Sequence, residues 1–279
     1  MTAQAALLFT APEFSGPIGV YDSGVGGLSV LKALRDALPG ESFLYVADSG
    51  HAPYGDRDEE FIESRAIEIA SFMVSRGAKA IVLACNTVSV VASAKLRSLH
   101  SIPIVAMEPA IKPAASHSRS KTVLVLATAK TIASPSVENL CRMFGEGVRI
   151  ILQPCPGLVE QVENGKFEED STGILLEKYL RPGLAEGADT IVLGCTHYPF
   201  LSAQIARIAG PGVTLIEPSA AIARQLSRVL EGKMEPDDSK GNAIFYTSGS
   251  APNMREFLEK TLAPYPEVHL LPASPILLG

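Results

Sequence analysis

The feature that most constrains this chain is a regular alternation of short β-branched runs with longer segments of helical period. IGVYD at 18–22 precedes an amphipathic stretch that Pro39-Gly40 ends, SFLYVAD at 42–48 leads to a helix expected over about 58–76, and KAIVLAC at 79–85 leads to the next helix. The alternation continues through IPIVAM, KTVLVLAT, VRIILQ, DTIVLGC, VTLIEP and AIFYTSG. This order predicts an α/β fold with mainly parallel sheets flanked by helices.

Two distant stretches of the chain are similar to each other. IVLACNT at 81–87 is followed by IPIVAMEPAI, and IVLGCTH at 191–197 is followed by VTLIEPSAAI. The cysteines are 110 positions apart (195 − 85), and the glutamates that precede proline are 109 apart (217 − 108). Any two α/β strands share apolar runs, but not a matched cysteine and a matched Glu-Pro. The repeat therefore predicts two pseudo-symmetric halves that face each other, with one thiol on each side of a shared cleft.

Composition excludes several classes of function. With 279 residues, 47% hydrophobic and 19% charged, the chain has enough apolar material for one large domain or two ordinary ones. Its net charge of −6 argues against nucleic-acid binding. No apolar run is long enough to span a membrane, and residues 1–17 lack the basic region of a secretory signal. We therefore expect a cytoplasmic protein whose residues 1–17 form a loose N-terminal extension.

The four cysteines contain no C-x-x-C pair, so neither a disulfide framework nor a zinc site is expected. Only Cys195 and His197 lie close together, and nothing near them completes a set of metal ligands. Cys141, in the helical pattern VENLCRMF, is interpreted as apolar filler. Cys155 is also interpreted as structural, although it lies at the end of an expected strand.

Cys85 and Cys195 each follow a strand and precede a helix. A helix N-terminus favours the thiolate over the thiol, whose ordinary pKa is about 8.5. For one such cysteine, buried filler and reactive thiol are equal alternatives. Two at matched positions, with Thr87 and Thr196 nearby, favour the reactive interpretation. His197, two residues beyond the second cysteine, can relay protons near neutral pH.

The segment DSGVGG at 22–27 is a glycine-rich turn between a strand and a helix. It is not a dinucleotide fingerprint, because Ser29 stands where the third glycine would be, and no P-loop lysine follows. Its backbone N–H groups suit a carboxylate or a phosphate, and Ser23 adds a hydroxyl. Asp22 has two interpretations: an N-cap of the following helix, which its position alone favours, or a carboxylate that assists Cys85. The polar loop at 47–57 is either plain surface or a ligand-contacting loop.

Two opposed acid–base groups without a metal or cofactor motif predict stereoinversion at carbon. One thiolate removes a proton from one face, and the opposite thiol returns a proton to the other face. Fixed N–H and hydroxyl donors would stabilise the charge that develops. An amino acid bound through its carboxylates would suit the donor-rich loops.

DSGVGGLSVL, PYGD, ACNT and GCTHYP, in this order, resemble the motifs of the glutamate racemases, within the aspartate/glutamate racemase superfamily. The resemblance covers nearly the whole chain from Ile18 onward. It implies a cytoplasmic isomerase, expected as a homodimer, that interconverts L- and D-glutamate without cofactor or metal and supplies D-glutamate for peptidoglycan. It also implies two α/β domains with the active site between them: residues 1–108 plus 216–279, and residues 109–215.

The same resemblance implies roles for individual residues. Cys85 and Cys195 match the two catalytic thiols, the first acting as base on D-glutamate and the second on L-glutamate, while Asp22 and His197 match the residues that assist them. All four also belong to the expected substrate-binding set, whose other members are Ser23, Pro53, Tyr54, Gly55, Asn86, Thr87 and Thr196. Glu163 aligns with a further acidic residue of the family site, although Glu160-Gln161 replaces the expected Pro-Leu before it.

Two other functions fit parts of the pattern. A sister enzyme with the same two-cysteine cleft could act on aspartate or a hydantoin, but the DSGVGG, ACNT and GCTHYP set favours glutamate. A binding or regulatory protein could use the fold without turnover. The presence of both thiols and both assisting residues argues against that second alternative.

Overall fold

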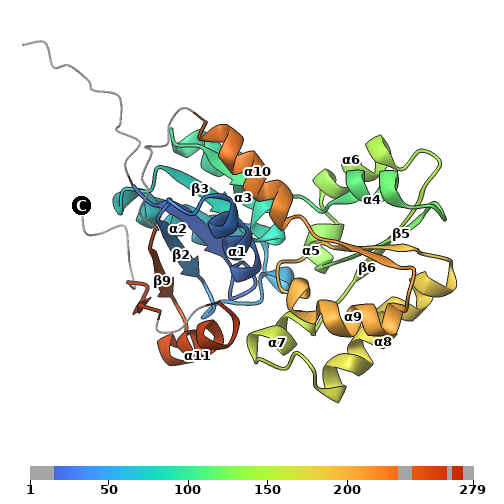
Figure 1. Cartoon of the computed structure of the whole chain (residues 1–279). Coiled ribbons are helices and arrows are strands. Elements are labelled where there is room, and N and C mark those ends of the chain that lie inside the picture. Colours follow the sequence, from blue (N-terminus) through green and yellow to red (C-terminus); the bar gives the residue numbers. More distant parts are fainter. Residues whose placement is uncertain (1–15, 232–240, 263–265, 273–279) are drawn as a thin grey trace, which may run out of the picture.

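The computed structural model describes residues 16–231, 241–262 and 266–272, in which strands and helices alternate along the chain (Figure 1). The strands are β1 (Ile18–Asp22), β2 (Phe43–Ala47), β3 (Ala80–Leu83), β4 (Ile104–Ala106), β5 (Thr122–Ala127), β6 (Arg149–Pro154), β7 (Thr190–Leu193), β8 (Thr214–Ile216), β9 (Ala243–Thr247) and β10 (Val268–Leu270). The α-helices are α1 (Leu28–Ala37), α2 (Glu59–Ser75), α3 (Asn86–Leu99), α4 (Ile111–His117), α5 (Ala129–Ile132), α6 (Pro135–Phe144), α7 (Leu158–Glu163), α8 (Asp170–Ala185), α9 (Ser202–Ala209), α10 (Ser219–Val229) and α11 (Ala251–Thr261). Two 3₁₀ turns, η1 (Tyr54–Asp56) and η2 (Tyr198–Leu201), complete the set.

The strands form two sheets in which every pairing is parallel. The first sheet has the order β10-β9-β2-β1-β3-β4, and the second has the order β6-β5-β7-β8. The order β2-β1-β3-β4 thus recurs as β6-β5-β7-β8, so the repeat extends to four strands and their connections. The predicted fold class, α/β with mainly parallel sheets flanked by helices, is confirmed.

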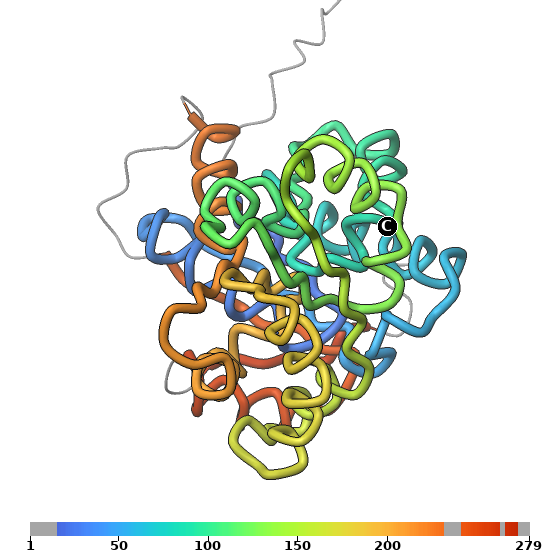
Figure 2. Tube along the Cα trace, turned by 90° about the vertical axis from the view of Figure 1, so that its right-hand side faces the viewer, coloured from blue at the N-terminus to red at the C-terminus, as the bar shows by residue number. Residues whose placement is uncertain are grey.

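Each sheet lies in its own body, and the two bodies lie side by side (Figure 1). Viewed from the second sheet, its green to orange elements lie in front of the blue elements of the first (Figure 2). The first sheet takes strands from both ends of the described chain, and α10 packs on α1. The second sheet uses the middle of the chain, and α4 packs on β7 and α6. The predicted domain limits stay a prediction, and residues 1–15 of the expected extension lie outside the described residues.

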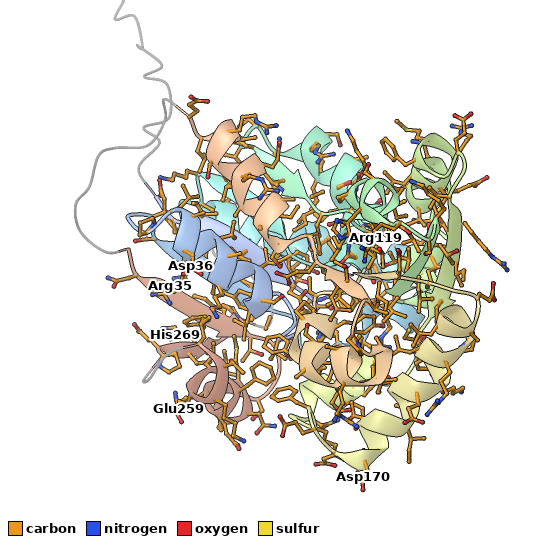
Figure 3. All side chains as sticks on the ribbon, turned by 45° about the vertical axis from the view of Figure 1, so that its right-hand side comes forward. Arg35, Asp36, Arg119, Asp170, Glu259 and His269 are labelled. Carbon is orange, nitrogen blue, oxygen red and sulfur yellow. The ribbon has the colours of Figure 1, made fainter. Side chains whose placement is uncertain are left out.

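The central strands are mainly apolar, with polar residues at their ends, because helices cover both faces of each sheet. All residues of β1, β2, β3, β5 and β7 are buried. Charged side chains such as Asp170 at the start of α8 and Glu259 on α11 point outward instead (Figure 3). Among the described residues, no helix combines the length and apolar character needed to cross a membrane.

The carboxyl ends of the strands position the polar residues. Parallel strands end at one edge of a sheet, where ligands bind in α/β proteins. These edges of the two sheets face each other, since the Thr196 hydroxyl beyond β7 donates to Asp22 at the end of β1 over 2.9 Å. The motifs predicted for the site therefore meet between the sheets.

Candidate active site

The first thiol stands between β3 and α3. Cys85 is the N-cap residue of α3 and is only 5% exposed. Its Sγ lies 3.5 Å from the hydroxyl of Ser23, which follows β1. Burial and the charge of Asp22 raise the pKa of Cys85 to about 11, against the opposing effect of Ser23 and the Val88 N–H at the helix start. At neutral pH the group is a thiol that can donate a proton.

The second thiol stands in the corresponding place after β7. Cys195 is 6% exposed, and its Sγ lies 3.7 Å from Nδ1 of His197. The other ring nitrogen of His197 lies 2.6 Å from a carboxylate oxygen of Glu163, at the end of α7. Burial acts to lower the pKa of His197, but the hydrogen bonds to Cys195 and Glu163 outweigh it and raise the pKa well above its ordinary value. The imidazole therefore holds a proton between the thiol and the carboxylate.

Asp22 connects the two bodies. Its buried carboxylate accepts a hydrogen bond from the Gly24 N–H at 2.7 Å and another from the Thr196 hydroxyl at 2.9 Å. The interpretation of Asp22 as a helix N-cap is wrong, because α1 begins at Leu28 with Gly27 as its cap residue and without a capping side chain. The carboxylate turns across the cleft instead. Burial raises its pKa to about 6, although the charge of His197 opposes the shift.

The glycine-rich turn allows the second body to approach closely. A Cβ on Gly24 would lie 1.8 Å from Oε1 of Glu163, and one on Gly26 would lie 2.3 Å from Nδ1 of His197. The Val25 N–H donates to the same Glu163 oxygen at 2.8 Å. The turn was expected to offer its N–H groups to a carboxylate, and two of them, those of Gly24 and Val25, donate to carboxylates of this chain.

Asn86 has polar atoms that the described protein does not satisfy. The residue is 2% exposed and begins α3 directly after Cys85. Neither its amide nitrogen nor its amide oxygen has a hydrogen-bond partner among the described residues. Buried polar groups in folded proteins are nearly always paired. An unpaired amide beside a thiol at a strand end is the arrangement expected of a ligand-binding side chain.

Thr87 contacts two residues that the sequence analysis did not single out. Its hydroxyl lies 3.0 Å from that of Thr128 and 3.4 Å from that of Thr131, both in the second body. In the first sheet Tyr21 pairs with Leu83, and Ser23 and Cys85 each lie two residues further on. In the second sheet Leu126 pairs with Leu193 in the same way, and Thr128 and Cys195 each lie two residues further on. Thr128 therefore has the place relative to Cys195 that Ser23 has relative to Cys85. Extending the internal repeat backward by one strand would have identified Thr128.

The PYGD loop closes the cleft from the first body. Gly55 lies so near the second body that a Cβ added to it would be 3.1 Å from Cβ of Thr128. Pro53 and Gly55 line a small pocket of about 30 Å³ together with Thr128 and Cys155. Tyr54 is buried beneath the loop and is hydrogen-bonded to Asp48. The loop therefore packs against the second body, and its contact with a ligand stays a prediction.

The remaining cysteines have structural surroundings. All four cysteines are free; Cys155 is buried at the end of β6, and Cys141 packs partly buried against the core around α4 and α6. Within the described part of the chain, no three His, Cys, Asp or Glu side chains are grouped so that they could hold a metal ion.

Two parallel sheets with the same strand order, each with a buried thiol beyond the corresponding strand, form the arrangement that the sequence predicted for an isomerase. A family model described as Asp/Glu/Hydantoin racemase matches residues 25–226, and the chain belongs to this family. Its curated relatives include glutamate racemases from Ectopseudomonas mendocina, 47% identical over 260 residues (92% of this chain, 99% of the relative), and Methylococcus capsulatus, 50% identical over 237 residues (84% and 88%).

Solved structures are similar along almost the whole chain. A glutamate racemase isoform from Bacillus anthracis has a TM-score of 0.85 at 31% identity, covering 93% of this chain and 98% of its own. The Escherichia coli glutamate racemase, in complex with L-glutamate and the activator UDP-MurNAc-ala, has a TM-score of 0.81 at 33% identity, covering 92% and 98%.

Proposed function

We propose that this chain is a glutamate racemase that interconverts L- and D-glutamate with two thiols and no cofactor. The observation that carries the proposal is the pair of buried thiols at the matched ends of β3 and β7, one from each sheet. The curated relatives at 47–50% identity support glutamate as the substrate.

The surroundings of the thiols suggest how the proton moves. With L-glutamate, Cys195 as thiolate removes the α-proton from one face, and the Cys85 thiol donates its proton to the opposite face of the carbanion. The raised pKa of Cys85 suits this donor role. With D-glutamate the direction reverses: Cys85 as thiolate abstracts, and the Cys195 thiol donates. Asp22, with a pKa of about 6, accepts the proton that Cys85 must lose first, whereas the protonated imidazole of His197 stabilises the thiolate of Cys195.

The substrate would be held by hydroxyl, amide and backbone donors around the thiols. The unpaired amide of Asn86 supports this assignment, because a bound amino acid supplies both the donor and the acceptor that it lacks. The full proposed binding set comprises Asp22, Ser23, Pro53, Tyr54, Gly55, Cys85, Asn86, Thr87, Glu163, Cys195, Thr196 and His197.

The proposal has three further parts, which rest on the motif resemblance. The enzyme acts as a homodimer, works in the cytoplasm and supplies D-glutamate for peptidoglycan. Its two domains comprise residues 1–108 plus 216–279 and residues 109–215, with the cleft between them.

The deciding experiment incubates the purified chain with L-glutamate in deuterated buffer containing a chelator and no added pyridoxal phosphate. Optical rotation and the α-proton NMR signal are followed together. We expect the rotation to fall to zero while deuterium enters at the α-carbon. A folded protein that changes neither signal with glutamate, but racemises aspartate, would overturn the choice of substrate. Inactivity on both would overturn the enzymatic function.

A further inference from the structure

The loop that carries Tyr54 and Gly55 is attached to the first sheet through a buried ion pair. Asp48, the residue after β2, has a side chain that is 0% exposed. Arg65 on α2 donates to both of its carboxylate oxygens, from Nε at 2.9 Å and from Nη2 at 2.8 Å. A bidentate arginine–carboxylate pair is short and directional, so it holds both partners in one geometry.

The same carboxylate holds Tyr54. The tyrosine hydroxyl donates to Oδ2 of Asp48 at 2.5 Å and lies 2.9 Å from the hydroxyl of Tyr21 on β1. The Asp48 N–H donates to the backbone carbonyl of Asp22 at 3.0 Å. Asp48 therefore connects three parts of the site: the strand of Asp22, helix α2 and the PYGD loop.

The role of this ion pair follows from its position rather than from its contribution to stability. A buried ion pair gains little net stability, because the desolvation of both charges offsets their attraction. The ion pair supports the loop of Gly55, which lies so close to the second body that a Cβ added to it would be 3.1 Å from Cβ of Thr128. A shift of Tyr54 by removal of its acceptor would move Gly55 with it, because the two are adjacent in η1.

We propose that Asp48 and Arg65 are positioning residues that hold Tyr54 and Gly55 in the geometry that binds the substrate. The inference rests on the proposed function, since it assigns the loop to the glutamate site. It predicts that loss of the ion pair weakens substrate binding in both directions, because the loop holds the substrate and moves no proton.

The chain offers a matched control for the cost of breaking a buried ion pair. Lys79 and Glu41 form a pair at 2.5 Å with side chains that are 8% and 11% exposed. Lys79 precedes β3, so this pair lies at the amino end of the first sheet, away from the cleft. The variants Asp48→Asn and Arg65→Gln are therefore compared with Lys79→Gln, and Arg65→Lys serves as the conservative variant.

The experiment measures KM, kcat and Tm for each variant with L- and D-glutamate. Asp48→Asn and Arg65→Gln should raise KM about 10-fold or more in both directions, with a smaller fall in kcat. Arg65→Lys should recover part of the loss, whereas Lys79→Gln should lower Tm and leave KM unchanged. If Asp48→Asn does not fold, the two Arg65 variants carry the comparison.

An unchanged KM in Asp48→Asn or Arg65→Gln, or a loss confined to kcat in one direction, would overturn the inference. The activity of the wild type in the same assay distinguishes failure of the proposed function from failure of the positioning role. An inactive wild type contradicts the proposed function, whereas an active wild type with unaffected Arg65 variants contradicts only the positioning role.

Discussion

The two thiols are equivalent in the fold but differ in their neighbours. Cys85 lies against a hydroxyl, that of Ser23, with the carboxylate of Asp22 close enough to raise its pKa. Cys195 lies against an imidazole that is itself hydrogen-bonded to Glu163. In the proposed mechanism the two thiols are therefore assisted by different groups, and we expect single substitutions to affect the two directions of the reaction unequally.

Replacing either thiol should slow racemisation strongly and leave exchange of the α-proton from one enantiomer only. Cys85→Ala and Cys195→Ala should each lower racemisation by roughly 10²–10⁴-fold, the usual contribution of a positioned acid or base. Cys85→Ala should still exchange the α-proton of L-glutamate with deuterated solvent, and Cys195→Ala that of D-glutamate. Proton NMR of each pure enantiomer measures this. Cys155→Ala is the matched control, a buried thiol expected to leave activity within a few-fold. Exchange from both enantiomers in either variant would contradict the assignment of faces.

The raised pKa of Asp22 predicts a pH dependence of the D-glutamate reaction. With a pKa of about 6, the carboxylate is protonated below that pH and cannot accept the proton of Cys85. The ratio kcat/KM for D-glutamate should therefore fall about tenfold per pH unit below pH 6. Asp22→Asn should have a lower kcat/KM for D-glutamate at every pH, and this value should not show the fall below pH 6. A wild-type profile that is flat between pH 5 and 7 would exclude Asp22 as the acceptor.

The same shift predicts that Asp22 destabilises the folded chain at neutral pH. Its pKa in the folded state, about 6, exceeds the ordinary value of 3.8, so the folded state binds the proton more tightly. The protonated Asp22 therefore stabilises the folded state, and this contribution to the free energy of unfolding is complete below pH 3.8. It is lost as pH rises through 6, a change of up to about 3 kcal/mol. The free energy of unfolding of wild type minus that of Asp22→Asn should thus fall between pH 4 and 7. Urea titrations at several pH values measure it, and a rising difference would contradict the raised pKa.

At the scale of elements, the turn between β1 and α1 must remain free of side chains so that the second body can approach. Gly26→Ala would place a Cβ 2.3 Å from Nδ1 of His197. The helix α1 beyond the turn has its own contacts, so the variant should fold and lose most of its activity. Gly173→Ala in α8 is the control: its Cβ would lie 3.5 Å from Oε1 of Gln204 on α9, an ordinary van der Waals contact.

Circular dichroism and the racemisation assay test this pair of variants together. Gly173→Ala should gain about 0.5–1 kcal/mol of stability, because alanine is the better helix former, and should keep full activity. Gly26→Ala with wild-type activity would show that His197 can move aside without cost.

At the scale of the whole molecule, the two bodies are connected through the site. Hydrogen bonds join Asp22 to Thr196, the Val25 N–H to Glu163, and the hydroxyl of Thr87 to that of Thr128. A substrate bound at these edges would contact both bodies and favour the closed folded state. Glutamate at about 100 times its Kd should stabilise the chain by roughly 2.7 kcal/mol, visible as a rise in Tm. Glutamine, which lacks the second carboxylate, should stabilise it much less at the same concentration. An equal rise with both ligands would contradict a site built for a dicarboxylate.

The sequence alone determined the α/β class, the parallel sheets and the matched places of Cys85 and Cys195. These follow from periodicity and from a repeat within short segments, which are local properties of the chain. The helix expected over about 58–76 is α2, Glu59–Ser75, because Asp58 caps it and the apolar spacing continues to its end.

Only the tertiary structure decided which groups of the two bodies lie against one another. Asp22 and Thr196 are 174 positions apart, and Val25 and Glu163 are 138 apart. The local turn pattern favoured Asp22 as a helix cap, because it contains no information about an opposing sheet edge. The Asp48–Arg65 pair, 17 positions apart within the first body, also left no motif, because it depends on how α2 packs beside the end of β2. Contacts between the edges of two sheets depend on how the bodies meet, and that arrangement has no local signature in the sequence.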